Sequence, residues 1–187
     1  WIAHHLGITR IRGPEGDYAR EHSHCDQAEW QEPWKFGIEA EIISRQSVED
    51  RYRLMPYLYT LFEETSRTGA PIIRPMVYEF QNDGVTHTVG DQFMLGPWIL
   101  AAPVLAEGAK ARTVYLPAGR WFEYGSGAVH TGPGLTTVDL RLGALPLFIR
   151  EGAIIPKRQL VQWTDQAPVN PLTLDLYPTA SPSTFTL

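Results

Sequence analysis

The segment from Glu39 to Arg67 intermixes apolar and charged residues at helical spacing. Apolar side chains at Val48, Tyr52 and Met55 recur every three to four residues, which would place them on one face of a helix. Ser47 is followed three residues later by Asp50, a pattern that can cap a helical turn. The pattern therefore predicts helical structure through this segment.

One proline and one glycine divide and end this helical pattern. Pro56 has no amide donor, so it predicts either a kink or a break that starts a second helix near Met55. Gly69 predicts the helix C-terminus. The residues that follow, 70–80, predict a short strand and a proline-containing loop, and Gly90–Gly96 predicts a short helical connector.

From Ile99 onward the apolar runs shorten to between four and seven residues and are separated by Gly, Pro and Ser turns. Such spacing is typical of a β-sandwich or barrel. Strands are expected at Ile99–Val104, Thr113–Leu116, Trp121–Tyr124, Thr136–Leu142 and Leu147–Ile149, with turns at Pro117–Gly119, Gly125–Gly127 and Gly132–Gly134. Another strand is expected to begin at Pro171.

The order of these patterns predicts an α/β part followed by an all-β part. The change in composition places a first domain boundary at about residue 96, and a weaker boundary lies near Gln166–Pro168. The chain opens on Trp1 and closes on an alternating, strand-like run at Ser183–Leu187. We therefore expect it to be a piece of a longer protein.

Composition removes several classes of function. The 187 residues hold 16 basic and 21 acidic side chains, a net charge of −5, without the basic clusters that nucleic acids or anionic membranes attract. The uncharged stretch Phe93–Ala106 falls short of the roughly 18 to 20 residues that span a bilayer. Cys25 is the only cysteine, so no internal disulfide can form. Phosphate loops, nucleophile elbows and dinucleotide-binding glycine motifs are absent, and no cofactor is expected.

The densest group of possible ligands is His22, His24, Cys25 and Asp26. Two histidines two residues apart on a strand could hold zinc. The other histidines have no comparable partners, so a metal site is the weaker interpretation. On spacing alone, His22 is either a structural histidine or a pocket residue that binds a substrate hydroxyl.

Two further sets of residues could serve carbohydrate chemistry. The carboxylates of Glu29, Glu32, Glu39 and Glu41 could supply an acid/base pair, although in a charge-rich segment a solvated face is the more common explanation. Among the aromatic residues, Trp30 and Trp34 are the better candidates for stacking on a sugar ring.

A series of short motifs, in family order across nearly the whole chain, resembles glycoside hydrolase family 31, the α-glucosidase and α-xylosidase family. The matching segments are Arg20–Ser23, Gln31–Gly37, Arg51–Thr60, Gly69–Met76, Asp91–Gly96, Ala102–Leu105, Tyr115–Pro117, Gly119–Trp121 and Phe148–Pro156.

This resemblance implies the last part of a (β/α)8 TIM barrel at residues 1–95 and a proximal C-terminal β-sandwich at 96–167. Residues 168–187 would begin a distal β-sandwich. The segment at Arg74 and Pro75 matches a further barrel strand, with a structural role for Arg74.

The resemblance also implies a retaining α-glycosidase acting on oligosaccharides or α-glycosides with non-reducing-end α-glucose or α-xylose. Its aspartate nucleophile and acid/base would lie outside this chain, so no catalytic residue is assigned here and the chain alone should be inactive. His22 would bind hydroxyls of the sugar. A noncatalytic carbohydrate-binding or interaction module of β-sandwich fold is the alternative, motivated by the aromatic-rich strand half.

Overall fold

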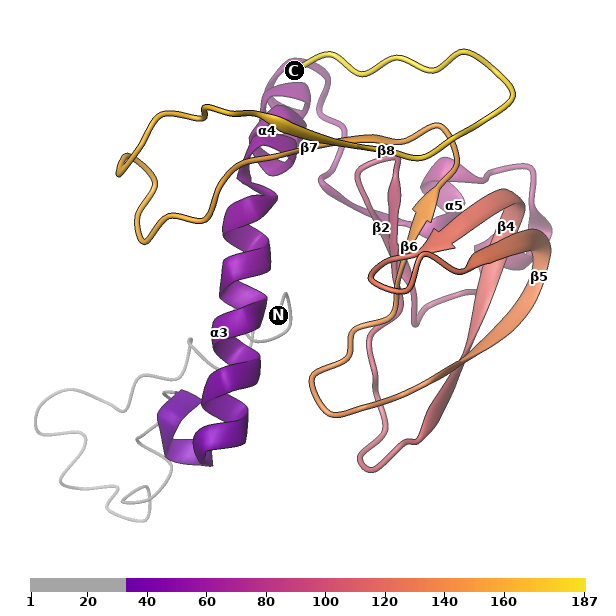
Figure 1. Ribbon diagram of the computed structural model, residues 1–187. Helices are drawn as coiled ribbons and strands as arrows, with labels where there is room; N and C mark the ends of the chain where they lie inside the picture. Colours follow the sequence, from indigo (N-terminus) through magenta and orange to yellow (C-terminus); the bar gives the residue numbers. More distant parts are fainter. Residues whose placement is uncertain (1–32) are drawn as a thin grey trace, which may run out of the picture. The chain divides into compact units, whose positions relative to one another are not determined.

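The computed structural model describes residues 33–187 (Figure 1). The chain divides into two compact units, residues 1–51 and 52–187. The first unit contributes the 3-10 helix η3 (Pro33–Phe36) and most of helix α3 (Ile38–Arg53). The second unit holds all other described elements.

Helix α3 is a solvated helix without fully buried residues. Arg45 bonds Glu41 one turn earlier at 2.8 Å, the spacing at which opposite charges meet on a helix. The pattern of Ser47 and Asp50 predicted a helix cap, but Ser47 does not cap a helix. It lies inside α3, where its hydroxyl donates to the carbonyl of Ile43 at 2.9 Å, a bond that lets a serine continue a helix.

Helix α4 (Met55–Thr68) confirms the predicted break at Pro56. Proline fits the first turn of a helix because backbone amides there have no intrahelical acceptor, so the missing N–H costs no hydrogen bond. The predicted end is also confirmed: Gly69 has φ 75° and its amide bonds the carbonyl of Thr65. The buried face of α4 carries Tyr57, Leu58 and Leu61.

A six-stranded antiparallel sheet forms the centre of the second unit, in the order β1-β2-β3-β6-β4-β5. Its strands are β1 (Ile73–Pro75), β2 (Phe93–Leu95), β3 (Ile99–Ala101), β4 (Ala111–Glu123), β5 (Val129–Asp139) and β6 (Leu147–Arg150). Short helices α5 (Met76–Glu79) and η4 (Gly84–His87) connect β1 to β2.

The long hairpin of β4 and β5 corrects two predicted turns. Pro117–Gly119 lies within β4 at a register irregularity between Leu116 and Gly119, and Gly132–Gly134 lies within β5. A Cβ on Gly132 would fall on the carbonyl oxygen of Pro117. This glycine is therefore required by close approach of two strands and not by a turn.

The first two strands also differ from expectation. Gly90–Gly96 contains β2 and not a helical connector, and β1 pairs antiparallel with β2 through Arg74 and Met94. Barrel strands run parallel, so the segment at Arg74 is not a strand of the barrel. The sheet also runs through the predicted boundary at residue 96, because β2 pairs with β3.

One apolar core lies against this sheet, with Trp121 and Phe148 among its fully buried side chains. Its buried members are Met76, Met94, Leu100, Ala102, Val114, Leu116, Trp121, Val138 and Phe148. They come from α5 and from β2 through β6, so burial of this cluster holds the sheet strands together.

A two-stranded antiparallel ladder completes the second unit, formed by β7 (Ile154–Lys157) and β8 (Thr173–Leu176). Figure 1 draws this ladder beside α4, and the amide of Arg158 bonds the carbonyl of Arg53 at 2.9 Å. Within residues 33–187, no helix combines the length and apolar character needed to cross a membrane.

Candidate functional site

The sequence-predicted site residues fall mostly outside the described part of the chain. His22, His24, Cys25, Asp26, Glu29, Trp30 and Glu32 all precede residue 33, and the side chain of Trp34 is likewise outside the description. Glu39 and Glu41 lie on α3, where Glu41 pairs with Arg45. This pairing agrees with the interpretation of a solvated, charged helix face.

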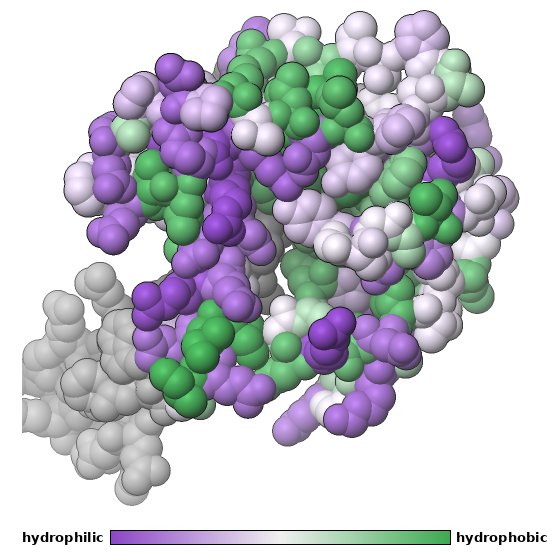
Figure 2. All heavy atoms as spheres, viewed as in Figure 1, coloured by the Kyte–Doolittle hydropathy of each residue, from purple (hydrophilic) through white to green (hydrophobic). Residues whose placement is uncertain are grey.

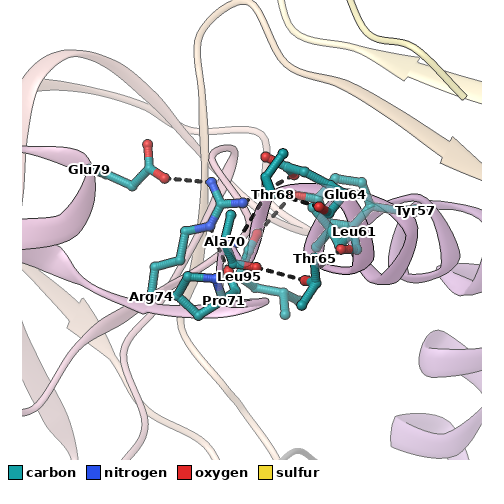
Figure 3. A network of polar contacts seen from close by, with 10 residues as sticks. All are labelled: Tyr57, Leu61, Glu64, Thr65, Thr68, Ala70, Pro71, Arg74, Glu79 and Leu95. Carbon is teal, nitrogen blue, oxygen red and sulfur yellow. Dashed lines mark hydrogen bonds and ion pairs between the residues drawn. The ribbon is translucent and has the colours of Figure 1, made fainter.

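A buried polar cluster of the second unit centres on the guanidinium of Arg74, whose side chain is only 5% exposed. Its nitrogens donate to Glu79 at 2.6 Å, to Glu64 at 3.1 Å and to the carbonyl of Pro71 at 2.7 Å. Figure 3 shows the two carboxylates reaching the guanidinium from opposite sides. Arg74 therefore joins α4, β1 and α5 at one point.

The guanidinium of Arg74 stays protonated in this cluster. Burial by itself lowers the pKa of Arg74, but the hydrogen bond that it donates to Glu79 and the charges of both carboxylates outweigh burial and leave the pKa above its usual value. Three of the five N–H donors of Arg74 are engaged by two carboxylates and a carbonyl, and burial keeps the side chain from solvent. Arg74 thus has a structural role, as the sequence analysis expected. No sequence pattern had predicted that Glu64 and Glu79 would be its partners.

Tyr57 connects the same helix to the sheet through a second buried contact. Its hydroxyl donates to the carbonyl of Leu95 at 2.8 Å, and burial strongly raises the pKa of the phenol, which stays protonated. Gly96 follows with φ 61°, and a Cβ there would lie 2.6 Å from both the Tyr57 hydroxyl and a methyl of Leu61. Helix α4 can pack this closely because residue 96 has no side chain.

Two ionic clusters join the β7–β8 ladder and its flanking chain to the sheet. Glu151 accepts bonds from the amide of Arg120 at 2.9 Å and from its guanidinium at 3.0 Å. Lys157 on β7 bonds Asp175 on β8 and donates to the hydroxyl of Tyr124 at 2.9 Å. These carboxylates are engaged with cations and brace the fold.

Two hollows flank α4 and share Tyr59, Thr60 and Leu187. The first, of about 550 Å³, is mostly apolar. Apart from this hollow, Figure 2 shows apolar side chains gathered at the top of the view, where Figure 1 places β7 and β8. The lining of the first hollow is Met55, Pro56, Tyr59, Thr60, Arg158, Thr164, Asp165, Ala167, Pro168, Val169, Leu172 and Leu187. Arg158 is buried there and donates to the carbonyls of Thr164 and Ala167.

The second hollow, of about 820 Å³, mixes aromatic and polar side chains. It is lined by Tyr59, Thr60, Leu61, Glu63, Glu64, Arg67, Thr68, Pro97, Trp98 and residues 184–187. Both hollows are large enough for a small organic ligand. Across residues 33–187, no three His, Cys, Asp or Glu side chains gather into a group that could hold a metal ion.

Family models match two successive parts of the chain. The model described as the glycosyl hydrolase family 31 TIM-barrel domain matches residues 18–61, and the model of the family 31 C-terminal domain matches residues 69–155. The match to the barrel model includes His22 and ends inside α4. The match to the C-terminal model begins at Gly69, the residue that ends α4.

Similar proteins include enzymes of more than one specificity. A probable glucan 1,3-α-glucosidase of Oryza sativa subsp. japonica is 37% identical over 159 residues, covering 84% of this chain and 17% of that protein. An α-xylosidase of Saccharolobus solfataricus is 35% identical over 126 residues, covering 67% of this chain and 17% of that protein.

A solved structure with a similar fold is the family 31 dextranase of Flavobacterium johnsoniae in complex with isomaltotriose. It superposes with a TM-score of 0.79 at 42% identity, over 81% of this chain and 19% of that chain. The chain thus spans less than a fifth of the length of the similar proteins named here.

Proposed function

Because this chain belongs to glycosyl hydrolase family 31, we propose that it forms part of an α-glycosidase that cleaves O-glycosidic bonds of non-reducing-end α-glucose or α-xylose. The observation that carries the proposal is the succession of two family domains in one chain, with a TM-score of 0.79 to a dextranase at 42% identity. The substrate would be an oligosaccharide or another α-glycoside.

We propose that the barrel part ends with α4, near residue 68, which is earlier than the sequence pattern suggested. Two findings support this boundary: β1 belongs to the antiparallel sheet, and the C-terminal family model begins at residue 69. The remaining sheet would be the proximal C-terminal β-sandwich domain. Residues 168–187, which include β8, would start a distal β-sandwich.

We propose that the hydrolysis uses two aspartates that lie outside this chain. A retaining glycosidase uses one carboxylate as nucleophile and one as acid/base, about 5 Å apart, and forms a covalent glycosyl-enzyme intermediate. Glu64, Glu79, Glu151 and Asp175 instead bind arginine or lysine. These four carboxylates are thus not candidates for the reacting pair, which in this proposal belongs to a longer chain.

His22 would bind hydroxyls of the sugar next to the cleaved bond. An imidazole can donate to or accept from a hydroxyl, and such bonds contribute most when they strengthen in the transition state. In the longer enzyme, we expect His22→Ala to lower kcat/KM for nitrophenyl α-glucoside or α-xyloside by about a hundredfold.

The matched control for that experiment is His87→Ala. His87 lies on η4 and its ring contacts the carbonyl of Gln81, within the C-terminal domain. Equal activity in the His22→Ala variant and in the unmodified enzyme would contradict the role of His22. Comparing the two nitrophenyl glycosides in the unmodified enzyme would assign glucose or xylose specificity.

A second candidate function is a noncatalytic carbohydrate-binding module of β-sandwich fold. The specific observation in its favour is the aromatic lining of the second hollow by Tyr59, Trp98 and Phe185. Saturable binding of a neutral oligosaccharide without hydrolysis, by the longer protein as well as by the 187-residue chain, is the result that this function requires.

A further inference from the structure

We propose that the hollow between α4 and residues 184–187 is a second carbohydrate site, separate from the pocket assigned to His22. It is lined entirely by residues of the second unit. Its volume of about 820 Å³ lies within the range of small-molecule sites. The ligand class is a neutral oligosaccharide.

Aromatic side chains supply the first part of the argument. Tyr59 is 77% exposed, and it lines the hollow together with Trp98 and Phe185. Phe185 is held in place because its ring stacks on buried Tyr57, with ring centroids 6.0 Å apart. Aromatic rings that line an open hollow offer the flat apolar surface on which the C–H face of a sugar packs.

The charged side chains supply the second part, because their pairing makes the hollow polar without a strong net charge. Glu63 pairs with Arg67 at 2.5 Å, and Glu64 pairs with Arg74 at 3.1 Å. Each paired carboxylate keeps lone pairs that can accept from a hydroxyl, and Arg67 keeps free donors. A ligand with many hydroxyls and no charge fits this balance better than a phosphate or an ammonium group.

Hydroxyl side chains extend the same lining. Thr60, Thr68, Thr184 and Thr186 all border the hollow. Thr60 and Thr68 donate to helix carbonyls one turn earlier. The oxygen of Thr68 also accepts from the amide of Ala70, so Thr60 offers the more open acceptor. Polar groups therefore surround the aromatic rings, an arrangement that would orient a sugar on the rings and select for its hydroxyls.

The test is a calorimetric titration of the 187-residue chain with maltotriose. We expect saturable binding, weakened about tenfold by Tyr59→Ala through loss of ring contact and retained by Tyr59→Phe. The matched control is Phe62→Ala, which removes a ring of similar exposure from the same helix but outside both hollows. It should bind as the unmodified chain does.

His22→Ala distinguishes this site from the proposed catalytic pocket. Binding that survives His22→Ala and is lost in Tyr59→Ala supports the second site, whatever the outcome for hydrolysis. Binding lost in His22→Ala and intact in Tyr59→Ala would overturn it and leave the proposed function standing. Absence of binding, or equal weakening by Phe62→Ala and Tyr59→Ala, would also overturn it. Circular dichroism of each variant verifies folding.

Discussion

The hydroxyl of Tyr57 on α4 donates a 2.8 Å hydrogen bond to the carbonyl of Leu95 on β2, and both groups are buried. This bond joins residues 38 positions apart, one within the match to the TIM-barrel family model and one within the match to the C-terminal model. Removing the hydroxyl by Tyr57→Phe leaves a buried carbonyl without its partner. We expect a loss of about 1–3 kcal/mol in the free energy of unfolding, measured by urea denaturation.

The control for this substitution is Tyr59→Phe, two residues along the same helix. Tyr59 is largely exposed, so removing its hydroxyl leaves no buried group without a partner. A change within about 0.5 kcal/mol is expected. Equal effects of the two substitutions would show that the bond to Leu95 contributes nothing specific.

The contact between Gly96 and α4 predicts a larger effect. Gly96→Ala would place a methyl group 2.6 Å from the Tyr57 hydroxyl and would also strain a backbone with φ 61°. Because both neighbours are buried, the helix must shift, at a cost of at least about 2 kcal/mol. Thermal denaturation of Gly96→Ala and Gly90→Ala tests this, since the space around Gly90 is open and its φ is not positive.

The Arg74 cluster predicts that one buried cation stabilises three elements together. Arg74→Met would leave the nearly buried carboxylate of Glu79 without a counter-charge, and we expect a loss of about 3–5 kcal/mol. Arg67→Met removes a surface arginine from a similar pair with Glu63 and should leave the urea midpoint unchanged. Comparable midpoints for both variants would contradict the structural role of Arg74.

The Glu151–Arg120 contact predicts a dependence of stability on pH. Hydrogen bonds from the backbone and side chain of Arg120 lower the pKa of Glu151 below its usual value of about 4.5. A carboxylate with a lowered pKa in the folded state stabilises the fold above that usual value, and this contribution is lost as the pH falls through the folded pKa.

The variant Glu151→Gln should therefore unfold at lower urea than the parent chain at pH 7, and the difference should shrink below pH 4. Glu107→Gln, which changes an exposed glutamate in a loop, is the control at both pH values. A difference between parent and Glu151→Gln that grows on acidification would contradict the assignment.

Features that depend only on residues close together in the sequence were predictable from the sequence. Pro56 and Gly69 marked the start and end of α4 because each limits the backbone by its own chemistry. The strand β6 at residues 147–150 stood out as a short apolar run between turn residues. The order of family motifs identified the family that the two domain models match.

Features that depend on long-range packing were not predictable in the same way. A strand as short as β2 has too few residues to show a period, so its glycine-flanked sequence resembled a connector. The glycines around Pro133 resembled a turn, although Gly132 serves close strand approach. Nothing in the sequence paired Arg74 with Glu64, ten residues away, or with Glu79, because only the folded sheet brings them together.

The central claim is that this chain supplies part of an α-glycosidase and not its reacting carboxylates. The most direct measurement is release of nitrophenol from nitrophenyl α-glucoside by the purified 187-residue chain. We predict no release above the rate in buffer. Release above that rate, and its loss in His22→Ala, would show that this chain contains a complete active site and would contradict the account.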